Sequence, residues 1–390
     1  VGVLTTGAQS YTGATSSTFN GTYTISGAAS AFGVTGPALL NGATSVSTNN
    51  GNISFSSTIN NAATLSLTAG TAAVTITGAT GGIAPLTSLT TSGNTIAVNN
   101  VRTNSVQSYT GTTSTTFNGT SYLTAANTFT VTGPALLGAG ATIDTTNSGS
   151  NPTGANISFS STINNGQTLT LNSGTVGTNN FSGIIGGGTA LTSLTTTGST
   201  IFNAGATNIT TSGAQAFNSA VSIAAATTTF TAGSNITFSG TITGASAGRN
   251  LTLTGGAGAN VFTLTGALSN LGTVTVTGAG GTDTLVVTAA TKSFNITSSN
   301  TGTITGLGGV ATAFNWSAIS NLTGGGTDTL TNTNTTNTWT LTGSNAGTVT
   351  NLSGSFAGMG TLTGGSGTDT LIGANAVNTW SINGGNSGTV

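Results

Sequence analysis

The sequence repeats itself at long range, and this self-similarity constrains the fold more than any other feature. One landmark lies at Gln9, Gln107 and Gln215, each followed two residues later by Tyr or Phe. A second landmark, Ile-x-Phe-Ser-x-x-Ile, begins at Ile53 and Ile157 and returns at Ile236. Because the landmarks keep their order over about 100 residues, each copy is predicted to be the same structural unit.

A shorter repeat organises the C-terminal third of the chain. The segment Gly-Thr-Asp-Thr-Leu recurs around Asp283, Asp328 and Asp369, at spacings of 41 to 45 residues. An aromatic residue follows each aspartate by eleven positions, and an aliphatic residue lies ten positions beyond it. The aromatic residues are Phe294, Trp339 and Trp380, and the aliphatic residues are Ile304, Val349 and Val390.

These two patterns predict the organisation of the chain. We expect a first repeat over residues 1–104, a second over 105–212, a partial third over 213–254, and a zone of short repeats over 255–390, all in one continuous rod. Both ends cut through repeats, so we expect a fragment of a longer chain.

Strands are the predicted element throughout. Thr273–Thr277 and Phe262–Thr265 alternate Thr with an apolar residue, which places the apolar side chains on one face of a strand. Gly and Asn separate such runs and favour corners. Charged residues make up 2% of the chain, so the common helix-forming Glu, Lys and Arg are nearly missing. Disorder normally combines low hydrophobicity with high net charge, whereas this chain is 35% hydrophobic with a net charge of −1.

A coil of short strands fits these patterns best. Winding the strands into a coil bonds each turn to the next and buries the apolar face, whereas a flat sheet leaves open edges. We therefore predict an all-β fold, a parallel β-helix (β-solenoid), with roughly 20 residues in each turn and two turns in each short repeat. A string of β-sandwich domains is the alternative for the repeat of about 100 residues, but the short repeat is too small for a sandwich.

Residues 1 to about 250 resemble the repeats of filamentous-haemagglutinin-like bacterial surface proteins. The resemblance rests on the Gly-Ala-Gln-x-Tyr/Phe element, on Ile-x-Phe-Ser, and on Leu-Thr-Ser-Leu-Thr at Leu86–Thr90 and Leu191–Thr195. It implies a right-handed parallel β-helix that is exported to the bacterial cell surface and serves in adhesion, biofilm or filament formation.

The short repeats resemble the RTX nonapeptide Gly-Gly-x-Gly-x-Asp-x-U-x, which Gly364–Ile372 matches at every position. This resemblance implies Ca²⁺ at Asp283, Asp328 and Asp369. In calcium rolls the nonapeptides stand in tandem, whereas here they are far apart, and Ca²⁺ takes 6 to 8 oxygen ligands. The other interpretation is a tight corner whose aspartate accepts backbone N–H groups.

The composition excludes most chemistry. The chain has no Cys, His or Glu, and Asp144 is the one acidic residue besides the three repeated aspartates. Paired acid–base groups, nucleophile–base pairs and zinc ligands are therefore missing, and we expect no enzyme activity and no cofactor other than calcium. The three cations, Arg102, Arg249 and Lys292, form no basic patch for nucleic acid. No apolar run is long enough for a membrane span.

We therefore expect an extracellular structural protein of a filament, fibre or stalk that associates with itself head to tail or laterally. The alternative is an adhesin rod that binds glycans or cells through the insertion Asn147–Pro152, which the first repeat lacks. Trp316, Trp339 and Trp380 could form a stripe that stacks on sugars, but the alignment of Trp316 with Phe356 and of Trp339 with Phe294 favours packing in the core. Thr-rich strands also suggest ice binding, although the Thr is spread over all strands.

Overall fold

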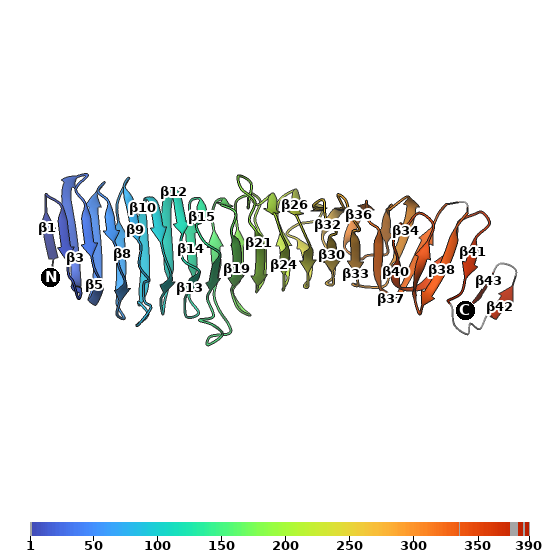
Figure 1. Ribbon diagram of the computed structural model, residues 1–390, viewed down its shortest axis with the longest axis horizontal. Helices are drawn as coiled ribbons and strands as arrows, with labels where there is room; N and C mark the ends of the chain where they lie inside the picture. Colours follow the sequence, from blue (N-terminus) through green and yellow to red (C-terminus); the bar gives the residue numbers. More distant parts are fainter. Residues whose placement is uncertain (1, 335, 375–380, 385–386, 390) are drawn as a thin grey trace. The chain divides into compact units, whose positions relative to one another are not determined.

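The computed structural model describes residues 2–334, 336–374, 381–384 and 387–389. All regular structure in these residues is β-strand, and the strands are mostly parallel and stacked in about 13 turns, which confirms the predicted β-solenoid (Figure 1). Two compact units make up the chain, unit 1 at Val1–Ala225 and unit 2 at Ala226–Val390. The hand of the coil and the repeat boundaries stay predictions.

Unit 1 is built from parallel strands that pair between neighbouring turns. Its strands are β1 (Gly2–Thr5), β2 (Gln9–Thr12), β3 (Ser17–Ala28), β4 (Phe32–Thr35), β5 (Ala38–Asn49), β6 (Ile53–Phe55), β7 (Ile59–Asn60), β8 (Thr64–Thr68), β9 (Ala73–Ile76), β10 (Ser88–Val98), β11 (Val101–Arg102), β12 (Gln107–Phe117), β13 (Ser121–Leu123), β14 (Phe129–Thr132), β15 (Ala135–Leu137), β16 (Ala141–Asp144), β17 (Ile157–Phe159), β18 (Ile163–Asn164), β19 (Thr168–Asn172), β20 (Thr178–Phe181), β21 (Ser193–Thr197), β22 (Ser199–Phe202), β23 (Asn208–Thr211), β24 (Gln215–Phe217) and β25 (Val221–Ile223).

Unit 2 continues the same kind of strand and adds antiparallel hairpins. Its strands are β26 (Thr227–Ala232), β27 (Ile236–Phe238), β28 (Ile242–Gly244), β29 (Arg249–Gly255), β30 (Val261–Leu264), β31 (Leu268–Ser269), β32 (Leu271–Thr277), β33 (Thr284–Val287), β34 (Ser293–Ser298), β35 (Thr301–Thr305), β36 (Val310–Ser317), β37 (Asn321–Asn332), β38 (Thr338–Gly343), β39 (Ala346–Val349), β40 (Phe356–Thr363), β41 (Thr370–Ile372), β42 (Ser381–Gly384) and β43 (Ser387–Thr389).

The length of a turn differs between the units. Hydrogen bonds between neighbouring turns of unit 1 join residues 21 apart at Thr71 and Asn50, and 28 apart at Asn165 and Leu137. In unit 2 the bonded residues are 23 positions apart in the sequence at Asn260 and Asp283, and 40 positions apart at Thr277 and Ser317. The predicted turn of roughly 20 residues is therefore close in unit 1 and in the first turns of unit 2, and too short where the turns of unit 2 contain hairpins.

The two short repeats that begin at Asp283 and Asp328 each form one turn with a hairpin, so the predicted two turns per repeat are wrong. In the β34–β35 hairpin Phe294 pairs with Ile304, and in the β38–β39 hairpin Trp339 pairs with Val349. The two residues of each pair, ten positions apart in the sequence, thus face each other across the two strands of a hairpin. The third pair, Trp380 and Val390, lies outside the described residues.

Alternating side chains fill the interior. Phe181 stacks on Phe159 and Phe202, with ring centroids 6.0 Å and 5.3 Å apart, so aromatic residues form a column through three successive turns. Trp316 and Trp339 are buried, with exposed fractions of 1% and 3%, which confirms that they pack in the core. Burial of these rings supplies much of the hydrophobic stabilisation, at about 25 cal/mol per Å² of apolar surface.

Asparagine and glycine form the corners, as predicted. Asn50 has a φ of 61° and Gly36 a φ of 91°, in the left-handed region that these residues tolerate best. The asparagines also connect turns, since Oδ1 of Asn100 accepts the backbone N–H groups of Thr120 at 2.7 Å and Ser121 at 3.0 Å. Backbone N–H groups at the corners, which have no partner within a strand, therefore donate to an acceptor on the neighbouring turn.

The repeated glutamine has a structural role. Gln107 is fully buried, and its Nε2 donates to the carbonyl oxygen of Leu123 on the next turn at 2.8 Å. Its Oε1 accepts the hydroxyl proton of Tyr109 at 2.9 Å. Gln9 makes the matching contact with Tyr11 at 3.1 Å. The Gln-x-Tyr landmark is therefore a hydrogen-bonded core element.

We predict that Gln107→Leu, which keeps most of the side-chain volume, lowers the free energy of unfolding by about 2 to 4 kcal/mol. The carbonyl of Leu123 and the hydroxyl of Tyr109 then lose partners in a dry interior. Urea denaturation checks this against Ser108→Ala, which truncates a neighbouring outward-facing side chain. Equal midpoints for the two variants would contradict the assigned role.

Two buried tyrosines predict a loss of stability in alkali. Burial raises the pKa of Tyr109 well above its ordinary value of 10.0, and nearby Tyr122 adds to the rise. Burial also raises the pKa of Tyr122, although the backbone N–H of Gly119 opposes this. The unfolded chain ionises first, so this stability is intact below pH 10 and falls as the pH rises above it. Urea midpoints measured up to about pH 11 should fall less steeply for the variant with both Tyr109→Phe and Tyr122→Phe. Parallel pH profiles for this variant and the unchanged chain would refute the prediction.

Candidate functional site

Each repeated aspartate accepts hydrogen bonds from a residue one turn earlier. Oδ1 of Asp283 accepts the backbone N–H of Asn260 at 2.7 Å and its Nδ2 at 2.8 Å. Asp369 repeats the arrangement with Asn337, at 2.9 Å and 2.7 Å. These contacts confirm the interpretation of the aspartates as acceptors of backbone N–H groups.

Asp328 has a lysine as its partner. Oδ1 of Asp328 accepts the backbone N–H of Lys292 at 3.0 Å, and Nζ of Lys292 lies 2.8 Å from Oδ2. The N–H of Gly325 also donates to Oδ2, at 2.6 Å. Sequence reasoning counted Lys292 only as a scattered cation, although its place two residues before Phe294, like that of Asn337 before Trp339, was a usable signal.

The three aspartates belong to separate pairs. Within the described residues, no cluster brings together three or more His, Cys, Asp or Glu side chains. The oxygens of Asp328 already accept an ammonium group and two backbone donors. Calcium at Asp283, Asp328 and Asp369 stays a prediction, and these contacts favour the structural interpretation of the aspartates.

The fourth aspartate shapes the predicted binding insertion. Asp144, at the end of β16, accepts the backbone N–H of Thr146 at 2.7 Å and that of Ser148 at 3.0 Å. The guanidinium of Arg102 donates to Oδ1 of Asn147 at 3.3 Å. A nearly buried carboxylate thus holds the start of the insertion Asn147–Pro152 in one conformation.

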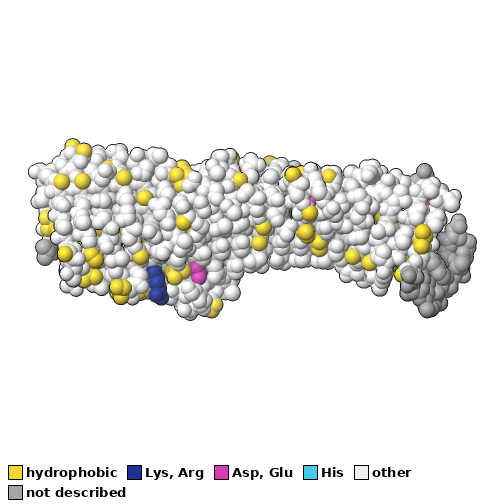
Figure 2. Space-filling view, viewed as in Figure 1, with side chains coloured by type: hydrophobic (Ala, Val, Ile, Leu, Met, Phe, Trp, Pro, Cys, Tyr) yellow, Lys and Arg dark blue, Asp and Glu magenta, His cyan; other side chains and the backbone are white. Residues whose placement is uncertain are grey.

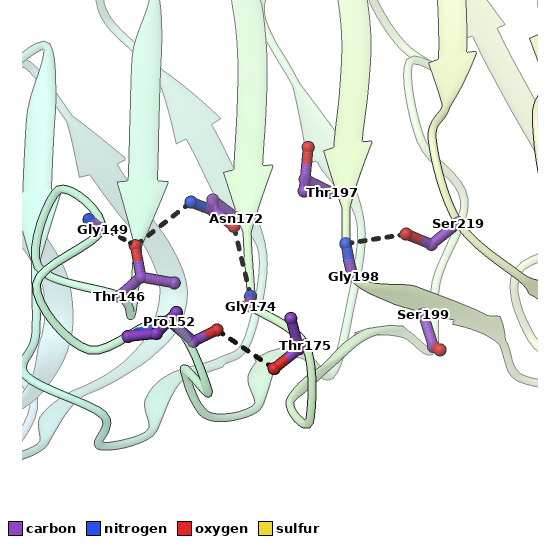
Figure 3. A pocket seen from close by; sticks show the side chains of 10 residues that line it. All are labelled: Thr146, Gly149, Pro152, Asn172, Gly174, Thr175, Thr197, Gly198, Ser199 and Ser219. Atoms are coloured by element: carbon purple, nitrogen blue, oxygen red, sulfur yellow. Dashed lines mark hydrogen bonds between the residues drawn. The ribbon is translucent and has the colours of Figure 1, made fainter.

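A groove of about 430 Å³ lies beside this insertion in unit 1 (Figure 3). Asp144, Asn172 and Thr197 are aligned partners on β16, β19 and β21, and the last two line the groove. Further lining residues are Thr146, Pro152, Thr175, Ser199 and Ser219. The spacing of these residues in the sequence gave no sign that they meet, because stacking of the turns brings them together.

The residues that line the groove are uncharged and include several hydroxyl and amide side chains, while apolar atoms make up most of the lining surface. Nδ2 of Asn172 donates a hydrogen bond to Oγ1 of Thr146 at 3.2 Å, and Oγ1 of Thr175 donates one to the carbonyl oxygen of Pro152 at 3.3 Å (Figure 3). Val176, which follows Thr175, is 74% exposed and places an apolar group near the hydroxyls. Such a surface suits a neutral ligand with many hydroxyl groups, because charge plays no part in the contact.

Outward-facing hydroxyls form continuous columns on one face of unit 1. One column runs through Ser45, Ser66, Thr90, Ser108 and Thr130, and a second through Ser47, Thr68, Ser92, Thr110 and Thr132. The sequence suggested that Thr was spread over all strands, whereas the parallel register collects hydroxyls into ordered rows. Ser and Thr are mixed in both columns, so the rows lack a regular array of methyl groups.

The chain carries almost no charge, and on the face shown in Figure 2 hydrophobic side chains are scattered singly and in small groups. Among the described residues, no helix has the length and apolar character needed to cross a membrane. No protein-family model, curated protein or solved structure matches the chain.

Proposed function

We propose that the chain is a non-catalytic, extracellular structural protein, a segment of a filament, fibre or stalk on a bacterial cell surface. The observation that carries this proposal is the stacking of parallel turns, in which the backbone of each turn bonds to its neighbours. A fold stabilised in this way gains length by adding turns and needs no central pocket. The sequence resemblance to filamentous-haemagglutinin-like surface proteins supports the same role.

Self-association is part of this proposal. An uncharged surface with rows of hydroxyls offers little electrostatic repulsion between copies, so lateral contact meets no like-charge barrier. Calcium at the RTX-like corners would be an added stiffening element and is not required for it.

We predict that the purified chain assembles as its concentration rises, and that pulling it from both ends extends it in steps of about one turn. Sedimentation velocity over a concentration series measures the assembly, and single-molecule force spectroscopy measures the steps. Thr90→Lys together with Thr130→Lys places charges in a hydroxyl column and should weaken lateral assembly without changing the steps. A chain that stays monomeric at every concentration would contradict self-association, and extension in one domain-sized step would contradict the stalk.

The groove beside Asn147–Pro152 favours a second candidate function, the binding of a neutral glycan by an adhesin. Hydroxyl and amide groups from three turns face one hollow, and Asp144 fixes the loop at its edge. A loop that is already ordered loses little conformational entropy when a ligand binds.

We predict that glycan-array binding, where detected, falls at least about tenfold in Asn172→Ala combined with Thr175→Ala, a loss of about 1.4 kcal/mol. Thr90→Ala, on an exposed strand position outside the groove, is the matched control and should leave binding unchanged. Binding that survives the double variant would place the glycan elsewhere, and a blank array with the unchanged chain would remove the adhesin proposal for neutral glycans.

A further inference from the structure

Lys292 stands where its two sister turns have asparagine. Asn260 and Asn337 satisfy their aspartates with two neutral donors, the backbone N–H and Nδ2, both directed at Oδ1. In the third pair the backbone N–H of Lys292 donates to Oδ1 of Asp328, whereas Nζ contacts Oδ2. Since asparagine is sufficient to pair with the aspartate, lysine adds something else, a primary amine beside a carboxyl group.

The pair is enclosed in the interior of unit 2. The side chains of Lys292 and Asp328 are 0% and 1% exposed. Nζ of Lys292 has the ring of Phe294 at 5.4 Å and donates to the carbonyl oxygen of Ala290 at 3.1 Å. Taking two charges out of water carries a large desolvation penalty, which opposes the attraction between them. An amide that joins the same two side chains carries no charge and avoids this cost.

We propose that Lys292 and Asp328 condense into an isopeptide bond that joins two neighbouring turns of unit 2. Proton transfer within the pair leaves a neutral amine and a carboxylic acid, and Nζ then attacks Cγ of Asp328. The Nζ–Cγ bond forms, the Cγ–Oδ2 bond breaks, and Oδ2 departs as water with two protons from the former ammonium group. The step is a dehydration within the chain, so it needs no oxidant, reductant or second substrate.

The surroundings of Asp328 favour this step. The N–H of Lys292, 3.0 Å from Oδ1, is placed to stabilise the negative charge that develops there in the tetrahedral intermediate. The N–H of Gly325 holds Oδ2 at 2.6 Å and fixes the carboxyl group against Nζ. Holding both reactants in contact removes the entropic cost of bringing them together.

The bond would tie the solenoid at a defined place. Lys292 and Asp328 are 36 residues apart, and the segment between them contains the β34–β35 hairpin and β36. Phe294 and Leu330, two residues further on in each strand, are parallel partners of β34 and β37. A covalent link would therefore close one complete turn and restrict the unfolded chain, as a disulfide does in a protein with cysteine.

Intact-mass spectrometry of the purified, denatured full chain tests the proposal. We expect the unchanged chain to be lighter than its sequence mass by one water molecule, and digestion to yield a branched peptide that joins Lys292 to Asp328. Lys292→Asn reproduces the Asn260–Asp283 pair, so it should fold and have its full sequence mass. Asp328→Ala should also have its full sequence mass.

Each other outcome counts against the bond. A full sequence mass for the unchanged chain after prolonged incubation in its folded state would overturn the proposal. A missing water that persists in Lys292→Asn would identify a cyclic imide at an aspartate and would also overturn it. Circular dichroism of Lys292→Asn shows whether that variant is folded, and the branched peptide decides the question independently of the variants.

Discussion

The parallel hydrogen-bond ladder between turns is the interaction on which the rest of the structure depends. The parallel strands pair with strands of the turns before and after them, as β10 does with β8 and β12, so backbone donors and acceptors are satisfied without a helix or a closed sheet. The register also fixes which side chains face inward, because a slip of one residue would turn every apolar side chain outward. Columns of like residues, such as Phe159, Phe181 and Phe202, follow directly from this register.

The same ladder explains how a chain with so few charges buries polar groups. A polar side chain in the interior needs a partner, and the nearest position is the equivalent one on the next turn. Gln107 bonds to the backbone of Leu123 one turn ahead, and Asn260 pairs with Asp283 in the same way. Gln107 and Asn260 therefore each depend on a partner in the next turn, and a change in one member of such a pair is felt by the other.

Much of the fold could be predicted from the sequence, because period-two alternation and fixed offsets are local properties. Phe294 and Ile304, which pair across a hairpin, are recognisable in the sequence by their constant spacing of ten residues. The number of turns could not be predicted, since the same spacing can close a second turn or fold back as a hairpin. The groove was also beyond sequence reasoning. Its residues Thr146, Asn172 and Thr197 sit at or beside the ends of strands that become neighbours only when the turns stack.

Stacked turns give a stalk and a binding loop different mechanical requirements. A stalk resists force through many equivalent ladder bonds, which can be lost one turn at a time, so a local weak point decides its strength. A loop that binds must keep its shape while the turns beneath it bear load. Asp144 meets this requirement because its carboxylate bonds to the loop backbone at Thr146 and Ser148, and so fixes the loop from the strand itself. The position of that carboxylate at the end of β16 would therefore let one turn serve both of the functions that we propose.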